Sequence, residues 1–180
     1  MNSERPDGIL IRRLDPTDSL ADLTDLLHRA YRPLAEAGMR FLATHQGEEV
    51  TRRRIARGEC FVAVREGRVV GTIVFRDPAA TTGCAYYERP GVSCLNQFAV
   101  EPELQKHGIG SALLDAVEAR AREVGATEIA LDTAETATHL IRYYSGRGYR
   151  IVDTTQWEVT NYRSVVMALH LGEPEAETRS

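Results

Sequence analysis

The chain has 180 residues, of which 43% are hydrophobic and 27% are charged, a composition typical of a soluble globular protein. It carries 22 Lys and Arg residues against 26 Asp and Glu residues, a formal net charge of −4. This balance argues against a nucleic-acid partner, because neutralising phosphates requires a surplus of basic side chains. No apolar stretch approaches the roughly 20 residues that span a bilayer, which argues against a membrane partner.

Length and cysteine content predict a single cytoplasmic domain. The three cysteines are an odd number without a CxxC spacing, and no apolar signal segment opens the sequence, so we expect free thiols in a reducing cytoplasm. A chain of this length can bury a core of its own. We expect one domain with a core over about 8–171 and polar, mobile tails at 1–7 and 172–180.

The first half of the sequence predicts strands and helices in alternation. Leucines recur on one face after Asp18 or Ser19, either of which can cap a helix that runs to about Tyr31. Two apolar runs separated by the turn REGR predict a β-hairpin. The expected elements are a strand at 9–14, helices at 18–31 and 48–56, and hairpin strands at 60–64 and 69–75.

The second half begins with a loop at 77–91 that is rich in Pro, Gly and Thr. The elements expected after it are strands at 92–100, 128–132, 149–153 and 164–171, with helices at 108–124 and 137–146. Hairpin strands come first and helices alternate with strands later. This order predicts the α/β or α+β class with a mixed sheet.

The turn before the helix at 108–124 has two glycines next to polar side chains. The first N–H groups of a helix lack intrahelical partners, and glycine lets a ligand approach them closely. Gln105, Lys106 and His107 add donors beside Gly108 and Gly110. The stretch is typical of a diphosphate-binding site. The alternative is that Gly108 only allows the turn and Gly110 only allows close packing. The Walker motif is absent, and the dinucleotide fingerprint fails at its third glycine.

Two other groups of residues favour structural interpretations. The basic run from Arg52 to Arg57 is typical of a solvated helix face. The five histidines show no metal-ligand spacing with Asp or Glu, so we expect no metal.

Two segments together resemble the GNAT superfamily of N-acetyltransferases. The stretch FAVEPELQKHGIGSALL at 98–114 is similar to its acetyl-CoA-binding segment, which follows a strand ending in V-x-P and has the core [QR]-x-x-G-x-[GA]. The stretch YYSGRGY at 143–149 is similar to its Y-x-x-x-G-[FY] ending, and the strand at 128–132 lies between them. The resemblance is specific over about 92–153 and rests only on the order of elements over 9–75.

The resemblance implies a GNAT fold with a central mixed, mostly antiparallel sheet, splayed between its fourth and fifth strands and flanked by about four helices. The opening would let the pantetheine arm of acetyl-CoA pair with exposed backbone groups. The residues that would contact this cosubstrate are Phe98, Ala99, Val100, Gln105, Lys106, His107, Gly108, Ile109, Gly110 and Ser111.

The resemblance also implies a role for Tyr144, which matches the family's tyrosine and would protonate the departing thiolate as general acid. Some relatives place a glutamate on the strand before V-x-P as base, but residues 93–97 here contain no carboxylate. Water, Asp132, a group from the loop 77–91 or an acceptor with a low intrinsic pKa would each serve. Cys94 as a nucleophile is disfavoured, because the family transfers the acetyl group directly.

The acceptor pocket is expected from the region 31–41, beginning at Tyr31, and from the loop that holds Tyr86 and Tyr87. Arg32 or Arg40 would receive a substrate carboxylate, or both are surface residues. Together these features predict direct acetyl transfer to a primary amine of a small molecule or peptide. The alternative is a non-catalytic acyl-CoA-binding or sensing module of the same fold. The assembly state stays open, a homodimer included.

Overall fold

The computed structural model describes residues 3–4 and 8–172 of the chain. Within these residues the strands form one eight-stranded sheet in the order β1-β2-β3-β4-β5-β6-β8-β7. The strands are β1 (Ser3–Glu4), β2 (Leu10–Arg13), β3 (Glu59–Arg65), β4 (Arg68–Arg76), β5 (Val92–Val100), β6 (Glu128–Ala134), β7 (Arg150–Gln156) and β8 (Arg163–His170). The helices are α1 (Leu20–Glu36), α2 (Glu48–Ile55), α3 (Ile109–Glu123) and α4 (Thr138–Gly146). The predicted mixed α/β class is confirmed.

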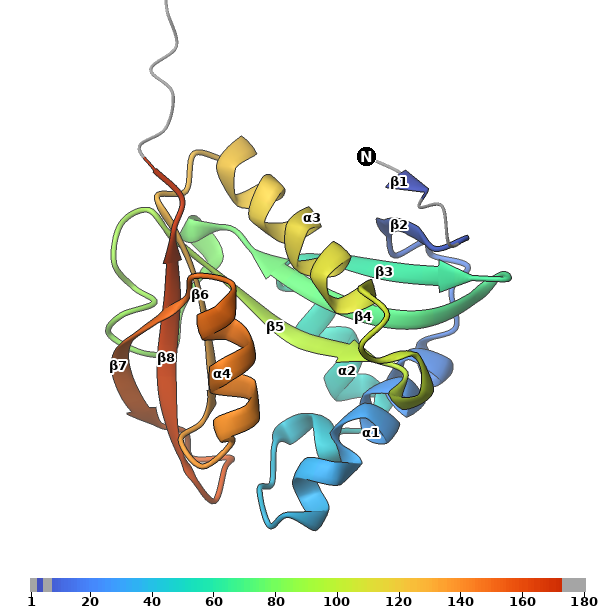
Figure 1. Ribbon diagram of the computed structural model, residues 1–180, viewed down its shortest axis with the longest axis horizontal. Coiled ribbons are helices and arrows are strands. Elements are labelled where there is room, and N and C mark those ends of the chain that lie inside the picture. The colour runs from blue at the N-terminus through green and yellow to red at the C-terminus, as the bar shows by residue number, and fades with distance from the viewer. Residues whose placement is uncertain (1–2, 5–7, 173–180) are drawn as a thin grey trace, which may run out of the picture.

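Neighbouring strands pair antiparallel everywhere except between β5 and β6, which run parallel. This parallel ladder is short: it covers Val92 to Cys94 on β5 and ends at the pair Cys94–Ala130. The remainder of β5 stays paired with β4 only, and Figure 1 shows it running away from β6 and β8. The splay therefore lies between the two strands predicted at 92–100 and 128–132.

A β-bulge in β5 lies just beyond the end of this ladder. Thr72 on β4 pairs with Ala99 and Val74 pairs with Asn96, so Gln97 and Phe98 together lie opposite Ile73. Gln97 has a φ of 50°, a left-handed conformation that is uncommon for residues other than glycine. A bulge bends its strand and increases the local twist, which carries the end of β5 away from β6.

The helices cover both faces of the sheet. Side chains on β3 alternate between the faces: Phe61 and Ala63 pack with the α3 residue Leu113, whereas Cys60 and Val62 pack with the α1 residue Leu23. The α4 residue Tyr144 joins the cluster on the α3 face. On the opposite face of β5, β6 and β8, Tyr86 and Tyr87 from the loop after β4 complete a second cluster. Among the described residues, no helix is long and apolar enough to cross a membrane.

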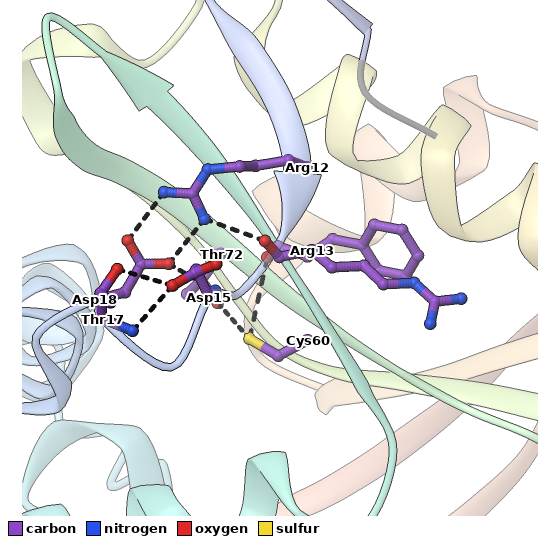
Figure 2. Close-up of polar contacts among 8 residues, drawn as sticks. Arg12, Arg13, Asp15, Thr17, Asp18, Cys60 and Thr72 are labelled. Atoms are coloured by element: carbon purple, nitrogen blue, oxygen red, sulfur yellow. Dashed lines mark hydrogen bonds and ion pairs between the residues drawn. The ribbon is translucent and has the colours of Figure 1, made fainter.

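The connection between β2 and α1 is fixed by an ion pair. The Arg12 guanidinium donates two hydrogen bonds to the Asp18 carboxylate, from Nη1 to Oδ2 at 2.6 Å and from Nη2 to Oδ1 at 2.8 Å (Figure 2). The bond from Arg12 keeps the pKa of Asp18 below its ordinary value. Ser19 caps the helix, because its Oγ accepts from the Asp22 N–H at 3.1 Å. Of the two N-caps that the sequence predicted, Asp18 and Ser19, the structure has Ser19.

The first helix is longer than its predicted end at about Tyr31. It continues to Glu36 through Pro33, which lacks the N–H needed for an intrahelical bond. Buried packing outweighs this loss: Leu34, one residue later, packs against Met39 and Ala134. Within the N-terminal segment predicted as a tail, Ser3–Glu4 forms β1, which pairs with β2. The rest of that tail, and residues 173–180, lie outside the described residues.

Candidate active site

The glycine turn connects β5 to α3 and forms the N-terminus of the helix. After a short 3₁₀ turn at Pro102–Leu104, Lys106 and Gly108 adopt left-handed φ values of 66° and 82°. Gly108 is the N-cap of α3 and provides no capping side chain. The first N–H groups of α3 therefore receive no side-chain cap from this residue, at the end where the helix dipole is positive.

A cavity of about 630 Å³ opens beside this turn, between β5, α3, α4 and α1. Most of the residues predicted to contact the cosubstrate line it: Phe98, Ala99, Val100, Gln105, Lys106, Gly108, Gly110 and Ser111. Two of the predicted residues do not. The Ile109 side chain packs in the core, and the His107 side chain is exposed, with Nδ1 2.8 Å from the Gln105 carbonyl oxygen. The buried Ile109 can reach a ligand only through its main chain.

Two features of this cavity leave room and a polar atom for a ligand. A Cβ added to Gly110 would lie 3.2 Å from Phe98 Cζ and 3.3 Å from the Tyr143 hydroxyl, so a side chain there would crowd the cavity wall. In addition, Thr133 Oγ1 is buried without a hydrogen-bond partner on the cavity lining. Such a buried polar atom is uncommon in proteins and is readily satisfied by a ligand.

Two carbonyl groups of β5 accept hydrogen bonds from side chains where β5 has separated from β6. The Tyr31 hydroxyl donates to the Phe98 carbonyl at 3.0 Å, and the Gln105 amide donates to the Val100 carbonyl at 3.2 Å. Both acceptors belong to the part of β5 that has left β6. An extended ligand with amide N–H groups would exchange with these side chains as an added strand.

Tyr144 lies where this cavity meets a second one. The second cavity, of about 340 Å³, shares five residues with the first: Tyr31, Phe41, Phe98, Asp132 and Tyr144. The Tyr144 hydroxyl makes no hydrogen bond to the described residues, and its ring packs between Phe98 and Tyr149. Burial, with smaller contributions from neighbouring tyrosines, raises the pKa of Tyr144 well above 10. The phenol therefore keeps its proton and has it available for donation.

Asp132 is the only carboxylate among the described residues that line the two cavities. Its Oδ1 accepts from the Tyr87 hydroxyl at 3.1 Å, and its Oδ2 accepts from Trp157 Nε1 at 2.8 Å. These bonds hold the Asp132 carboxylate at the boundary between the two cavities. Tyr31, the other residue predicted to bind the acceptor, lines both cavities, and burial raises its pKa to about 12.

The second cavity has a lining that the sequence predicted only in part. Tyr87 lines it, whereas Tyr86 bonds to Glu128 at 2.8 Å outside it. Arg32 and Arg40 are absent from both linings. Arg54, Arg57 and Arg76 line the second cavity instead. The interpretation of the run 52–57 as a solvated face holds for the exposed Arg52 and Arg53 but is wrong for Arg54, which is half-buried.

Cys94 also lines the second cavity, and it is poorly suited to act as a nucleophile. Burial raises its pKa to about 11, so the thiol stays protonated near neutral pH. All three cysteines are free thiols, as the sequence predicted. No group of three or more His, Cys, Asp or Glu side chains in the described part of the chain is arranged to hold a metal ion.

A splayed mixed sheet with a glycine turn at its opening is the arrangement expected for the GNAT class of acetyl-CoA-dependent acyltransferases. Comparison with known proteins agrees: the model of the Acetyltransferase (GNAT) family matches residues 20–149. The S-(2-succino)cysteine N-acetyltransferase of Bacillus subtilis strain 168 is 33% identical over 129 residues, which cover 71% of this chain and 76% of the relative. The chain belongs to the GNAT acetyltransferase family, a family of N-acetyltransferase enzymes.

Solved structures show the same fold. The ribosomal-protein-S18-alanine N-acetyltransferase of Escherichia coli superimposes with a TM-score of 0.70 at 18% identity, covering 96% of this chain and 99% of that one. A GNAT family acetyltransferase from Elizabethkingia anophelis, solved with acetyl-CoA bound, gives a TM-score of 0.65 at 17% identity, covering 91% and 99%. The predicted family and fold are confirmed. The role of each site residue stays a prediction.

Proposed function

We propose that this enzyme transfers the acetyl group of acetyl-CoA directly to a primary amine, in a ternary complex. The observation that carries the proposal is the junction of two cavities at Tyr144, Asp132 and Phe98. One cavity has the features that suit coenzyme A, and the other offers a separate entrance for an acceptor. A thioester carbonyl held at the junction would be open to attack from the acceptor cavity.

The chain's own residues would divide the binding of acetyl-CoA between them. The amides of Ile109, Gly110 and Ser111 at the N-terminus of α3, with Lys106 beside them, would bind the diphosphate. The carbonyls of Phe98 and Val100 would bond to the pantetheine arm in place of Tyr31 and Gln105. The bound cosubstrate supplies an acetyl thioester as the activated acyl group.

Two proton transfers complete the reaction. As the new N–C bond forms and the C–S bond breaks, Tyr144 would donate its proton to the departing thiolate. The amine must lose a proton, and for a lysine-like amine with a pKa of about 10.4 the cost of neutrality at pH 7 is roughly 4–5 kcal/mol. Asp132, the carboxylate at the junction, would bind the ammonium group and receive its proton directly or through water.

The name of the Bacillus subtilis relative indicates an acceptor for the first assay. S-(2-succino)cysteine is an amino acid with one primary amine, and we propose a small amine of this kind for the present enzyme. The sequence and its three free thiols also support a reducing, cytoplasmic setting for this activity.

A thiol-release assay with acetyl-CoA tests the proposal across S-(2-succino)cysteine, neutral amino acids, diamines and peptide N-termini. We expect release that saturates with at least one class, together with a matching acetylated product by mass spectrometry. Calorimetric titration with acetyl-CoA runs in parallel. Binding of acetyl-CoA without release for every amine class would contradict the proposal and favour the non-catalytic acyl-CoA-binding module.

A further inference from the structure

Three arginines converge on the acceptor cavity without acidic partners. Arg54 comes from α2, Arg57 follows α2, and Arg76 ends β4, and all three line the cavity. Within the described residues none of them forms an ion pair, whereas arginines elsewhere, such as Arg12, Arg29 and Arg147, do. Among the described residues, the lining thus carries three positive charges and the single negative charge of Asp132.

Arg54 is held in place by a buried network of neutral groups. Its Nη1 donates to Gln46 Oε1 at 2.6 Å, and Gln46 Nε2 in turn bonds to Thr51 Oγ1 at 2.8 Å and to Gln97 Oε1 at 2.7 Å. Gln46 and Gln97 are 2% and 3% exposed. The network ties α2 to the bulge of β5 and fixes the guanidinium without neutralising it.

This arrangement is costly for the free protein. Burial lowers the pKa of Arg54, which means that the charged form is disfavoured where it stands. Buried charges in proteins are ordinarily paired. An unpaired guanidinium that the fold positions so firmly is best accounted for by an anion that it receives.

Unpartnered polar atoms on the same lining point to a ligand with both acidic and basic groups. Gln97 Nε2 and Arg76 Nε are buried donors without a hydrogen-bond partner, and Asn96 Oδ1 is a buried acceptor without one. All three residues line the acceptor cavity. The two donors complement carboxylate oxygens, whereas Asn96 Oδ1 and Asp132 complement an ammonium group.

We propose that the acceptor is an amine that carries at least two carboxylates. Arg54 binds one carboxylate through its planar guanidinium, which matches the planar carboxylate. Arg76 binds the other through its unpartnered Nε, since its Nη2 already donates to the Ala80 carbonyl. The exposed Arg57 adds positive charge to the lining. Asp132 and Asn96 direct the amine toward Tyr144. This inference rests on the proposed acetyl transfer and names its substrate class.

The test compares acidic amines with their neutral amides: aspartate with asparagine, glutamate with glutamine, and S-carboxymethylcysteine with its amide. We expect kcat/KM for thiol release to be at least about tenfold higher for the acid in the preferred pair. Arg54→Gln and Arg76→Gln are expected to remove this preference by raising KM. Arg53→Gln, an exposed neighbour of Arg54, is the matched control and is expected to retain it.

The melting temperature separates this role from a structural one. Arg54→Gln removes an unpaired, half-buried charge but also the hydrogen bond that Gln46 Oε1 accepts. These two effects oppose each other, so the melting temperature is expected to change little while the acid preference is lost. If Arg54→Gln unfolds the chain, the ratio of kcat/KM for acid and amide is measured in Arg76→Gln and Arg57→Gln instead. That ratio then decides whether these arginines bind the carboxylates.

Each remaining outcome has a defined meaning. Equal kcat/KM for acids and amides would overturn this inference and leave acetyl transfer intact. A preference for phosphoserine over all carboxylates would overturn it in favour of a phosphate-bearing amine. Calorimetric binding of the acids that Arg54→Gln abolishes, without thiol release, would support the inference while contradicting the proposed function.

Discussion

The Tyr144 ring on α4 and the Phe98 ring on β5 lie 6.4 Å apart, centroid to centroid, at the boundary between the two cavities. The contact joins the helix that holds the proposed acid to the strand that would hold the pantetheine arm. The Tyr144 hydroxyl takes no part in this packing, so its chemistry can be tested apart from its structural role.

Tyr144→Phe is expected to lower kcat by about a hundredfold or more, since general acid catalysis contributes on the order of 10²–10⁴. The ring remains, so the melting temperature and the Kd for acetyl-CoA should change little. Steady-state thiol release and calorimetry measure the two effects. Tyr143→Phe is the control, because Tyr143 is 39% exposed and lines only the first cavity. Unchanged turnover in Tyr144→Phe would rule out the assigned role.

The pH profile of kcat should lack an alkaline limb from Tyr144 below about pH 10, the ordinary pKa of a phenol. The acid form is the active one, and burial raises the pKa of Tyr144 well above 10. Activity is therefore retained as pH rises toward that pKa and is lost only beyond it. A fall in kcat between pH 8 and 9 that vanishes in Tyr144→Phe would contradict this expectation.

Gly108→Ala is expected to weaken acetyl-CoA binding by about tenfold. Gly108 has a φ of 82°, and a Cβ in this left-handed region costs roughly 1–2 kcal/mol, so the turn would shift and displace the amides of α3. Calorimetric titration gives the Kd. The control is Gly146→Ala, because Gly146 is exposed, has an ordinary φ and would place its Cβ in open space. Equal affinities in the two variants would remove the turn from the binding site.

Cys94→Ala is expected to retain kcat within about threefold, because a thiol with a pKa near 11 is almost fully protonated at pH 7 and attacks poorly. Intact-mass spectrometry of the wild-type protein with acetyl-CoA and no acceptor should show no added acetyl group. An acetylated protein whose label is lost in Cys94→Ala would establish a covalent route instead.

Asp18→Asn is expected to lower the stability at pH 7 by about 1–2 kcal/mol, through loss of the charged bond to Arg12. Because the folded pKa of Asp18 lies below its ordinary value, this stabilisation is present above the unfolded pKa near 3.9 and disappears as pH falls through the folded pKa. Urea unfolding at pH 7 and pH 3 measures the change. A difference between wild type and variant that is equally large at both values would contradict the assignment.

Much of the fold followed from local pattern. The strand at 92–100 has the predicted bounds, and the helix predicted at 108–124 is observed as Ile109–Glu123. Such elements are visible in a sequence because periodicity and glycine chemistry act between near neighbours. The extension of α1 through Pro33 was not visible, because buried contacts of Leu34 with distant residues outweigh the local preference.

By itself, the sequence determined the order of the elements, the glycine turn before α3 and the presence of Tyr144, all of which depend on spacing along the chain. Only the tertiary structure decided which side chains come together where β5 separates from β6. The pairing of β5 with β6 ends at Cys94, and the bulge at Gln97 bends β5 beyond that point. Arg54 and Arg76 converge from separate elements. Pairing between distant segments sets these positions, and no local pattern encodes which side chains such pairing brings together.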